Sequence, residues 1–187
     1  IAPISKTTAM TEPGKLHPYV FRAAANTNTE GRSAAVFMAK HPWKKIYTIG
    51  PDYEYGQMVT KAFVEWIKKI KPDVEIVGQA WPKLGEADFT PFITAALAKK
   101  PDAAFFSLWG GDFVNFSKQA KPYGFYEKVK VVSAGEAGSP ETAIALKDDL
   151  PLGITTNAYH LFYYPDTPEN KAYVERLKAY TKQEYPP

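Results

Sequence analysis

The chain has 187 residues, of which 45% are hydrophobic, 14% aromatic and 23% charged. This length suits about one domain, and the apolar content argues against a disordered chain. The sequence contains no cysteine, which excludes disulfides, thiolate metal sites and a thiol nucleophile. No apolar run approaches the roughly 18 residues that a membrane span needs, so we expect a soluble protein.

The formal net charge is +3, which raises the question of a nucleic-acid partner. Basic residues form only short pairs such as Lys44-Lys45, Lys68-Lys69 and Lys99-Lys100, and elsewhere they alternate with acidic residues. A phosphate-binding surface needs basic residues clustered on one face. We therefore predict no binding to nucleic acid.

Strand and helix patterns alternate along the whole chain. The clearest helix pattern covers 56–70, where Val59, Phe63, Trp66 and Ile67 recur at helical spacing. The run Ala103–Trp109 is almost wholly apolar, as is typical of a strand buried on both faces of a parallel sheet. In chain order the sequence predicts strand Tyr19–Ala24, helix Arg32–His41, strand Lys45–Ile49, helix Gly56–Ile70, strand Val74–Ala80, helix Asp88–Lys99, strand Ala103–Trp109, helix Asp112–Lys121, strand Val129–Ala134, helix Pro140–Leu146, strand Gly153–Tyr159 and helix Pro168–Gln183.

Predicted strands begin about 25 to 30 residues apart, which is the length of one strand and helix unit. This spacing predicts an α/β fold with a doubly wound, mainly parallel sheet, as in flavodoxin-like and Rossmann-like layers.

Residues with catalytic or metal-binding patterns are scarce. His17, His41 and His160 are far apart, and none has a second potential ligand at metal-site spacing. Phosphate-loop, nucleophile-elbow and dinucleotide fingerprints are missing from the sequence. Acid pairs such as Asp52 with Glu54, or Asp112 with Glu136, have caps and solvated charges as the simpler interpretation. We predict no metal, no cofactor and no enzymatic activity.

Three loops at the carboxyl ends of predicted strands carry aromatic residues and glycines, and open α/β sheets place their ligands at these ends. The first is 52–56 with Tyr53 and Tyr55, the second is 108–112 with Trp109 followed by two glycines, and the third is 135–139 with one acid. Such a wall suits a small amphipathic ligand. The alternative, equally weighted on the residues alone, is that Tyr55 and Trp109 serve in core or rim packing.

Several stretches together resemble the type I periplasmic solute-binding proteins of ABC importers, specifically the branched-chain amino acid (Leu, Ile, Val) binding family. The stretches follow the family's order and spacing along the whole chain. They are Pro3-Ile4-Ser5 with Thr7-Thr8, Tyr19-Val20-Phe21-Arg22, Asp52-Tyr53-Glu54-Tyr55-Gly56, Ala87-Asp88-Phe89-Thr90, Pro101-Asp102, Lys118-Gln119-Ala120 with Gly124, and Gly153 with Tyr159.

The resemblance implies two α/β lobes that close on a ligand by hinge motion. Residues 1–21 then correspond to the end of the first lobe and a crossover, 22–156 to the second lobe, and 157–187 to a crossover back and a helix of the first lobe. The chain begins without an initiator Met or a signal-peptide layout and stops immediately after a helical pattern, and we expect it to be part of a longer protein.

Carried over by the resemblance, the expected ligand-binding residues are Thr7, Thr8, Tyr55, Trp109 and Glu136. Thr7 and Thr8 match the first-lobe loop that holds the ligand's carboxylate and amine, and Tyr55 matches the second-lobe tyrosine that closes on it. Trp109 stands at a position where the family often has an aromatic residue. The acid that pairs with an amino acid's ammonium aligns with either Glu136 or Gly135.

The resemblance therefore implies a periplasmic capture subunit of an ABC importer, with a membrane permease and an ATPase as partners. The ligand is a small amphipathic solute, either a branched-chain amino acid or an aromatic carboxylate. Rival hypotheses are a sensor or receptor domain of the same fold, the effector domain of a regulator, and an enzyme. We also expect weak or absent ligand binding, and self-association, for these 187 residues alone.

Overall fold

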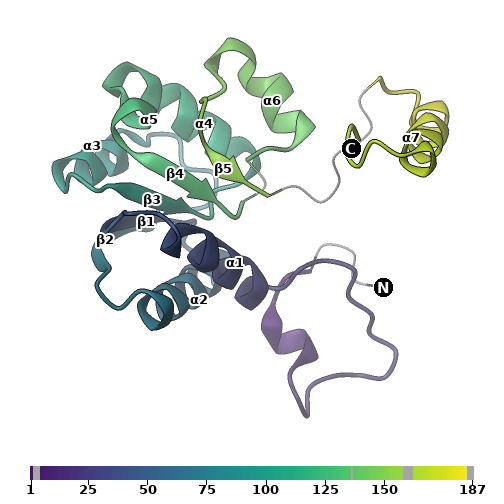
Figure 1. The fold of residues 1–187 in the computed structure, drawn as a ribbon, viewed down its shortest axis with the longest axis horizontal. Helices are drawn as coiled ribbons and strands as arrows, with labels where there is room; N and C mark the ends of the chain where they lie inside the picture. Colours follow the sequence, from purple (N-terminus) through teal and green to yellow (C-terminus); the bar gives the residue numbers. More distant parts are fainter. Residues whose placement is uncertain (2–4, 136, 158–161, 185–187) are drawn as a thin grey trace.

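A five-stranded, fully parallel sheet forms the centre of the molecule in the computed structural model, which describes residues 1, 5–135, 137–157 and 162–184. The strand order is β2-β1-β3-β4-β5. Figure 1 shows the sheet between two groups of helices. The strands are β1 (Lys45–Ile49), β2 (Glu75–Ala80), β3 (Ala103–Phe106), β4 (Lys130–Ser133) and β5 (Thr155–Thr156).

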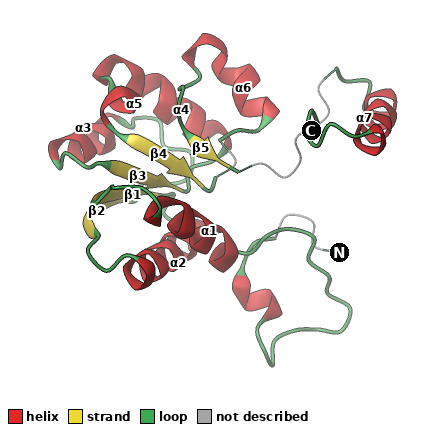
Figure 2. Cartoon of the chain, viewed as in Figure 1, coloured by secondary structure: helices red, strands yellow, loops and turns green. Residues whose placement is uncertain are grey.

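Helices cover both faces of this sheet, as Figure 2 shows. On one face lie α1 (Thr27–Ala39) and α2 (Glu54–Ile70). On the other lie α3 (Thr90–Ala98), α4 (Gly110–Ala120), α5 (Phe125–Lys128) and α6 (Pro140–Leu146). Helix α7 (Pro168–Thr181) and the segment before α1 extend away from the sheet (Figure 1). Short 3-10 turns are η1 (Thr8–Thr11), η2 (Lys121–Tyr123) and η3 (Lys147–Asp149).

The alternating side chains of β3 divide the core between the two faces of the sheet. Phe105 faces α1 and α2, where its ring stacks on Phe63 with centroids 4.1 Å apart. Phe106 faces α3 to α6, where its ring meets Phe116 edge-on at 4.9 Å. Every residue of β3 is buried. The predicted doubly wound α/β class and the doubly buried central strand are therefore confirmed.

Most predicted elements are present, with differences at their ends. Strand Lys45–Ile49 and helix Pro140–Leu146 have the predicted bounds. Helix α1 begins earlier than predicted, at Thr27, because the side chain of Asn26 caps it by accepting a hydrogen bond from the backbone N–H of Thr29 at 2.8 Å. This difference brings Glu30 into the helix.

The predicted strand Tyr19–Ala24 is wrong. Within it only Arg22 forms an isolated bridge, and the side chains of Tyr19 and Phe21 are 81% and 64% exposed. A strand is stable only when a neighbour satisfies its backbone groups. The predicted strand Gly153–Tyr159 is reduced to β5, and residues 158–161 lie outside the described part of the chain. Among the described residues, no helix has the length and apolar character to cross a membrane.

Candidate ligand-binding site

The strand order creates a switch point between β1 and β3. These strands are neighbours, yet the helices that follow them, α2 and α4, pack on opposite faces of the sheet (Figure 1). The two connecting loops, 50–53 and 107–109, therefore diverge at the carboxyl ends of the strands. Open α/β sheets bind their ligands in the crevice that such a divergence leaves.

The loop after β1 supplies two tyrosines with different environments. Tyr55, in the first turn of α2, is 8% exposed. Its hydroxyl donates to Oε2 of Glu30 at 3.1 Å and lies 3.3 Å from the carbonyl oxygen of Ala134. Tyr53 is half-buried, and its ring centroid lies 6.0 Å from that of Tyr55. The sequence brings both rings to the switch point, and the fold holds Tyr55 by its hydroxyl.

The loop after β3 places Trp109 at the surface of the same region. The indole is 44% exposed, and its Nε1–H donates to the Tyr53 hydroxyl at 3.1 Å, which joins the two loops. Burial raises the pKa of Tyr53, and this hydrogen bond partly opposes the rise. Gly111 follows in the first turn of α4, where a Cβ atom would meet nothing within 4 Å. The start of α4 after Trp109 is therefore uncrowded at Gly111.

Asp112 lies in the first turn of α4, and its carboxylate is hydrogen-bonded to the loop before α3. Its two carboxylate oxygens accept the backbone N–H of Gly85, at 3.1 and 3.2 Å. Burial raises its pKa, and the Gly85 hydrogen bond opposes the rise. Asp52 accepts a hydrogen bond from the Gln57 side chain at 2.8 Å. Asp52 and Asp112, one acid from each pair considered as catalytic, thus have local hydrogen-bond partners.

The loop after β4 packs tightly against the loop after β3. A Cβ atom on Gly135 would lie 1.8 Å from the carbonyl oxygen of Leu108, so only glycine permits this approach. The backbone N–H of Gly135 donates to Oγ of Ser133 at 3.2 Å. Glu136, the acid expected to face the ligand, lies outside the described residues.

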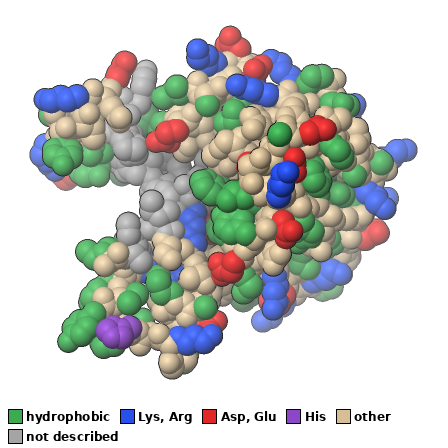
Figure 3. Space-filling model, turned by 180° about the vertical axis from the view of Figure 1, so that it is seen from behind, with side chains coloured by type: hydrophobic (Ala, Val, Ile, Leu, Met, Phe, Trp, Pro, Cys, Tyr) green, Lys and Arg blue, Asp and Glu red, His purple; other side chains and the backbone are tan. Residues whose placement is uncertain are grey.

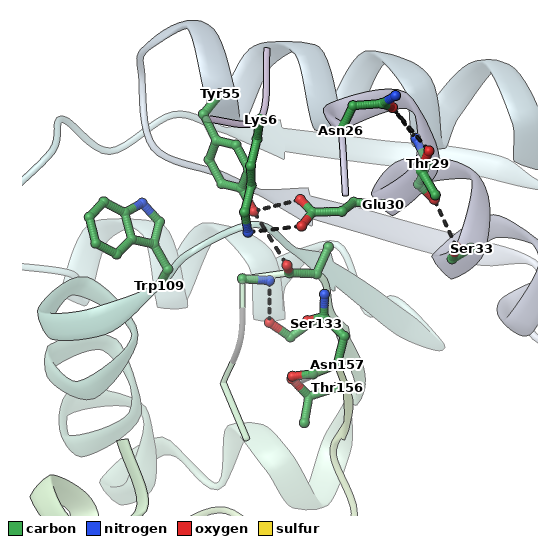
Figure 4. Close-up of polar contacts among 12 residues, drawn as sticks. Lys6, Asn26, Thr29, Glu30, Ser33, Tyr55, Trp109, Ser133, Thr156 and Asn157 are labelled. Carbon is green, nitrogen blue, oxygen red and sulfur yellow. Dashed lines mark hydrogen bonds and ion pairs between the residues drawn. The ribbon is translucent and has the colours of Figure 1, made fainter. Parts of the chain in front are cut away.

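Lys6, Thr7 and Thr8 run beside the amino end of α1. The Thr8 and Thr27 hydroxyls are hydrogen-bonded at 2.8 Å, and the guanidinium of Arg22 donates to the Thr7 carbonyl at 2.8 Å. The Lys6 ammonium lies 2.8 Å from Oε1 of Glu30, the same carboxylate that Tyr55 binds. Figure 4 shows Lys6, Glu30 and Tyr55 pointing toward one another.

These contacts bring part of the expected site together. Lys6, next to Thr7 and Thr8 in the chain, forms an ion pair with Glu30, and Glu30 accepts a hydrogen bond from Tyr55. Trp109 donates a hydrogen bond to Tyr53, two residues before Tyr55. Sequence reasoning did not assign Lys6 or Glu30 to the site, and it placed Tyr53 in the aromatic wall without naming it as a ligand-binding residue. The signal for Glu30 was the capping residue Asn26, which extends α1 over this position. No pattern in the sequence around Lys6 predicts that its side chain is buried.

A cavity of about 280 Å³ lies between α1 and the strands β4 and β5, next to Glu30. Its polar lining includes the hydroxyls of Thr29, Ser33, Ser133 and Thr156 (Figure 4).

Within the described parts of the chain, no three His, Cys, Asp or Glu side chains gather at metal-binding distance. On the face shown in Figure 3, Lys and Arg side chains are scattered among acidic and apolar ones.

The family model described as "Periplasmic binding protein" matches residues 1–187. The chain belongs to this family. The sequence resemblance to type I solute-binding proteins of ABC importers is thereby confirmed. Comparison with curated protein sequences finds no match.

Solved structures of solute-binding proteins share the fold. An ABC-transporter solute-binding protein from R. palustris in complex with benzoate is 22% identical, with a TM-score of 0.77, over 89% of this chain and 44% of its own. An amino acid ABC transporter substrate-binding protein from Pseudomonas fluorescens Pf-5 is 27% identical, with a TM-score of 0.74, over 90% of this chain and 45% of its own.

A Leu, Ile, Val, Thr and Ala-binding protein from Brucella ovis, in its closed conformation, is 20% identical, with a TM-score of 0.77, over 96% of this chain and 45% of its own. The chain thus spans less than half the length of these solved relatives.

Proposed function

We propose that this chain forms one wall of the ligand-binding cleft of a periplasmic ABC-importer capture protein. The observation that carries the proposal is the meeting of the two loops at the switch point, where exposed Trp109 is hydrogen-bonded to Tyr53 and is followed along the chain by the uncrowded Gly111. An aromatic wall beside a helix start suits a small ligand with an apolar body and a polar end. Tyr55, in the same loop region, is held in place because its hydroxyl donates to the buried carboxylate of Glu30.

The ligand in this proposal is a small amphipathic solute, either a branched-chain amino acid or an aromatic carboxylate. Relatives support both, because one binds benzoate and another is named for leucine, isoleucine, valine, threonine and alanine. The proposal includes a membrane permease and an ATPase as partners, and the periplasm as the location. It includes no catalytic step.

The proposed division of the chain follows the sequence expectation. Residues 1–21 end a first lobe, 22–156 form the second lobe with the sheet, and 157–187 return toward the first. The direction in which α7 and the segment before α1 extend from the sheet supports this division (Figure 1). Because solved relatives are more than twice as long, we expect this chain alone to bind with a dissociation constant of about 1 mM or weaker.

Such weak binding is measurable by NMR. Leucine, benzoate and 4-hydroxybenzoate are titrated to tens of millimolar while the indole N–H signals of the tryptophans are recorded. We expect the Trp109 signal to shift, and the Trp66 signal to stay, because Trp66 lies near the opposite end of α2 from Tyr55 and its indole donates to Asn28 of α1 at 3.2 Å. Failure of every solute to move the Trp109 signal would contradict the proposed function.

Two substitutions sharpen this test. Trp109→Ala removes an exposed indole and should weaken binding with little change in the melting temperature. Gly111→Ala places a methyl group in open space without strain, so it should leave the fold intact and weaken binding by obstruction. Replacement of Tyr55 and Trp109 together should abolish capture. If Trp109→Ala and Gly111→Ala both bound the solutes with wild-type affinity, the binding site would not lie at the switch point.

A further inference from the structure

The three lysine pairs noted in the sequence come together at one edge of the sheet. In a parallel sheet all strands begin at the same edge, and the helix before each strand ends there. Four segments meet at this edge, which is opposite the switch point, and we call them together the amino edge. They are 40–45, 68–75, 99–102 and 127–130.

Backbone hydrogen bonds join the four segments of the amino edge directly. The Lys44 carbonyl oxygen accepts the backbone N–H of Glu75 at 2.8 Å, and the Lys45 carbonyl oxygen accepts that of Asp102 at 2.8 Å. The Asp102 carbonyl oxygen in turn accepts the backbone N–H of Lys130 at 3.3 Å. Lysines that are distant along the chain are therefore neighbours in the fold.

Positive charge is concentrated at the amino edge. Its four segments contain ten lysines and four acidic residues, a formal charge of +6, whereas the whole chain carries +3. Nine of the ten lysines are exposed. Among the ion pairs between described residues, only that of Lys44 with Asp73, at 3.4 Å, involves one of them. The ten are Lys40, Lys44, Lys45, Lys68, Lys69, Lys71, Lys99, Lys100, Lys128 and Lys130.

Helix dipoles account for only part of this concentration. Lysines in the last turn of a helix are stabilised by the negative end of its dipole, and Lys68 and Lys69 occupy this place in α2. Lys45 and Lys130, however, are the first residues of β1 and β4, and strand dipoles are small. Like charges held this close together favour the binding of an anionic surface.

The opposite edge of the sheet has the opposite charge. The segments that follow β1, β2 and β3 are 50–56, 81–89 and 107–112, and they contain five acidic residues and one lysine, a formal charge of −4. The charge separation therefore runs along the strands. An anionic surface attracts the amino edge and repels the edge at the switch point, so it selects one orientation of the domain.

The chemistry of the amino edge suits a lipid surface better than nucleic acid or a protein. Helices α1, α2, α3 and α5 end at this edge, so none of them lies along it in position to enter a groove of a duplex. Ile70, which is 43% exposed, is the one exposed large apolar side chain in the four segments, too little for the core of a protein interface. Half-buried Trp43 lies at the same edge, and tryptophan is enriched at membrane–water interfaces.

We propose that the amino edge binds an anionic lipid bilayer, with the switch point facing away from the lipid. The lysines contact the headgroup phosphates, and Ile70 and Trp43 reach the interfacial layer. Each lysine close to such a surface strengthens binding about fivefold, and salt screens this attraction beyond about 8 Å at physiological ionic strength. This binding does not depend on which solute the switch point takes.

The test is sedimentation of the protein with vesicles of phosphatidylglycerol and phosphatidylcholine in equal parts, and with vesicles of phosphatidylcholine alone. An edge variant and a control variant each replace four exposed lysines by glutamine, so the net charge changes equally in both, and circular dichroism checks that both fold. The edge variant carries Lys68→Gln, Lys69→Gln, Lys99→Gln and Lys100→Gln, and the control carries Lys61→Gln, Lys83→Gln, Lys118→Gln and Lys171→Gln.

We expect the wild type to bind the anionic vesicles in about 50 mM salt and to be released in about 500 mM salt. The edge variant should bind about 100-fold less tightly or worse, and the control should lose less than about tenfold. Orientation is measured by NMR with bicelles of the same composition that contain a paramagnetic lipid. The indole N–H signal of Trp43 should broaden, and that of Trp109 should persist.

Each outcome decides the proposal. Selective loss in the edge variant, with Trp43 broadened, supports it. No binding to anionic vesicles in low salt, equal losses in the two variants, or stronger broadening of Trp109 than of Trp43 would overturn it. Tighter binding to a DNA duplex or to a polyglutamate peptide than to the vesicles would also overturn it, because the edge would then belong to another class of partner.

Discussion

Tyr55→Phe removes one hydroxyl from the buried contact that links α2, α1 and the end of β4. In the wild type this hydroxyl lies 3.1 Å from Oε2 of Glu30 and 3.3 Å from the Ala134 carbonyl oxygen. The ring itself remains in the variant, so the packing of the apolar atoms is preserved. The variant therefore isolates the hydrogen bonds that hold Tyr55 in place.

The expected loss follows from the burial of both acceptors. Glu30 is 4% exposed and Ala134 is 4% exposed, so little of either residue is open to bulk water. A buried acceptor that loses its partner costs about 1–3 kcal/mol, with the higher values for charged groups. For a domain of this size each kcal/mol lowers the melting temperature by about 2–4 °C. We expect Tyr55→Phe to lower it by about 3–10 °C.

Urea and thermal unfolding followed by circular dichroism measure this loss, with Tyr53→Phe as the matched control. Tyr53 lies in the same loop, and its hydroxyl accepts a hydrogen bond from Trp109, whose exposed indole can bind water instead. The control should lose less than about 1 kcal/mol. A loss in Tyr55→Phe no larger than in the control would refute the reasoning that Glu30 holds Tyr55 rigidly.

Two further predictions concern stability at the junctions between loops and the strands or helices that they join. Asp102 accepts the backbone N–H groups of Lys45 and Lys44, at 2.9 and 2.8 Å, and these bonds hold its pKa below the usual value. Its contribution to stability is present at neutral pH and disappears as the pH falls through the lowered pKa. Asp102→Asn should therefore cost about 0.5–1 kcal/mol at pH 7, and urea unfolding at several pH values should show the deficit shrinking below about pH 4. Gly56→Ala places a methyl group 2.1 Å from the Pro51 carbonyl oxygen, and thermal unfolding should show a loss of at least about 2 kcal/mol.

Controls and contrary results for these two variants are direct. A deficit in Asp102→Asn that is unchanged between pH 7 and pH 3 would mean that the ionised carboxylate is not the source of the stability. The control for Gly56→Ala is Gly111→Ala, where the added methyl group meets nothing within 4 Å. Equal stability of the two alanine variants would show that the turn at Pro51 yields without cost.

Local patterns in the sequence determined the sheet, the helices and the loops that meet at the switch point. The apolar run at 103–109 predicts a doubly buried strand, and helical spacing predicts α2, because both depend on neighbours a few residues apart. Because Tyr55 and Trp109 both follow the carboxyl ends of parallel strands, the order of elements in the sequence is enough to place them in one region. The strand predicted at Tyr19–Ala24 failed because a strand depends on a partner that the local pattern does not specify.

Only the tertiary structure decided how these residues are held. The contacts among Lys6, Glu30, Tyr55 and Ala134 join four segments that are distant along the chain. Their formation depends on how α1 packs against α2 and on the start of α1 at its Asn26 cap. Burial of a charge is acceptable only where an opposite charge arrives in the right geometry. Only the packed fold meets that condition. For this reason the sequence around Lys6 does not by itself predict that the Lys6 side chain is buried.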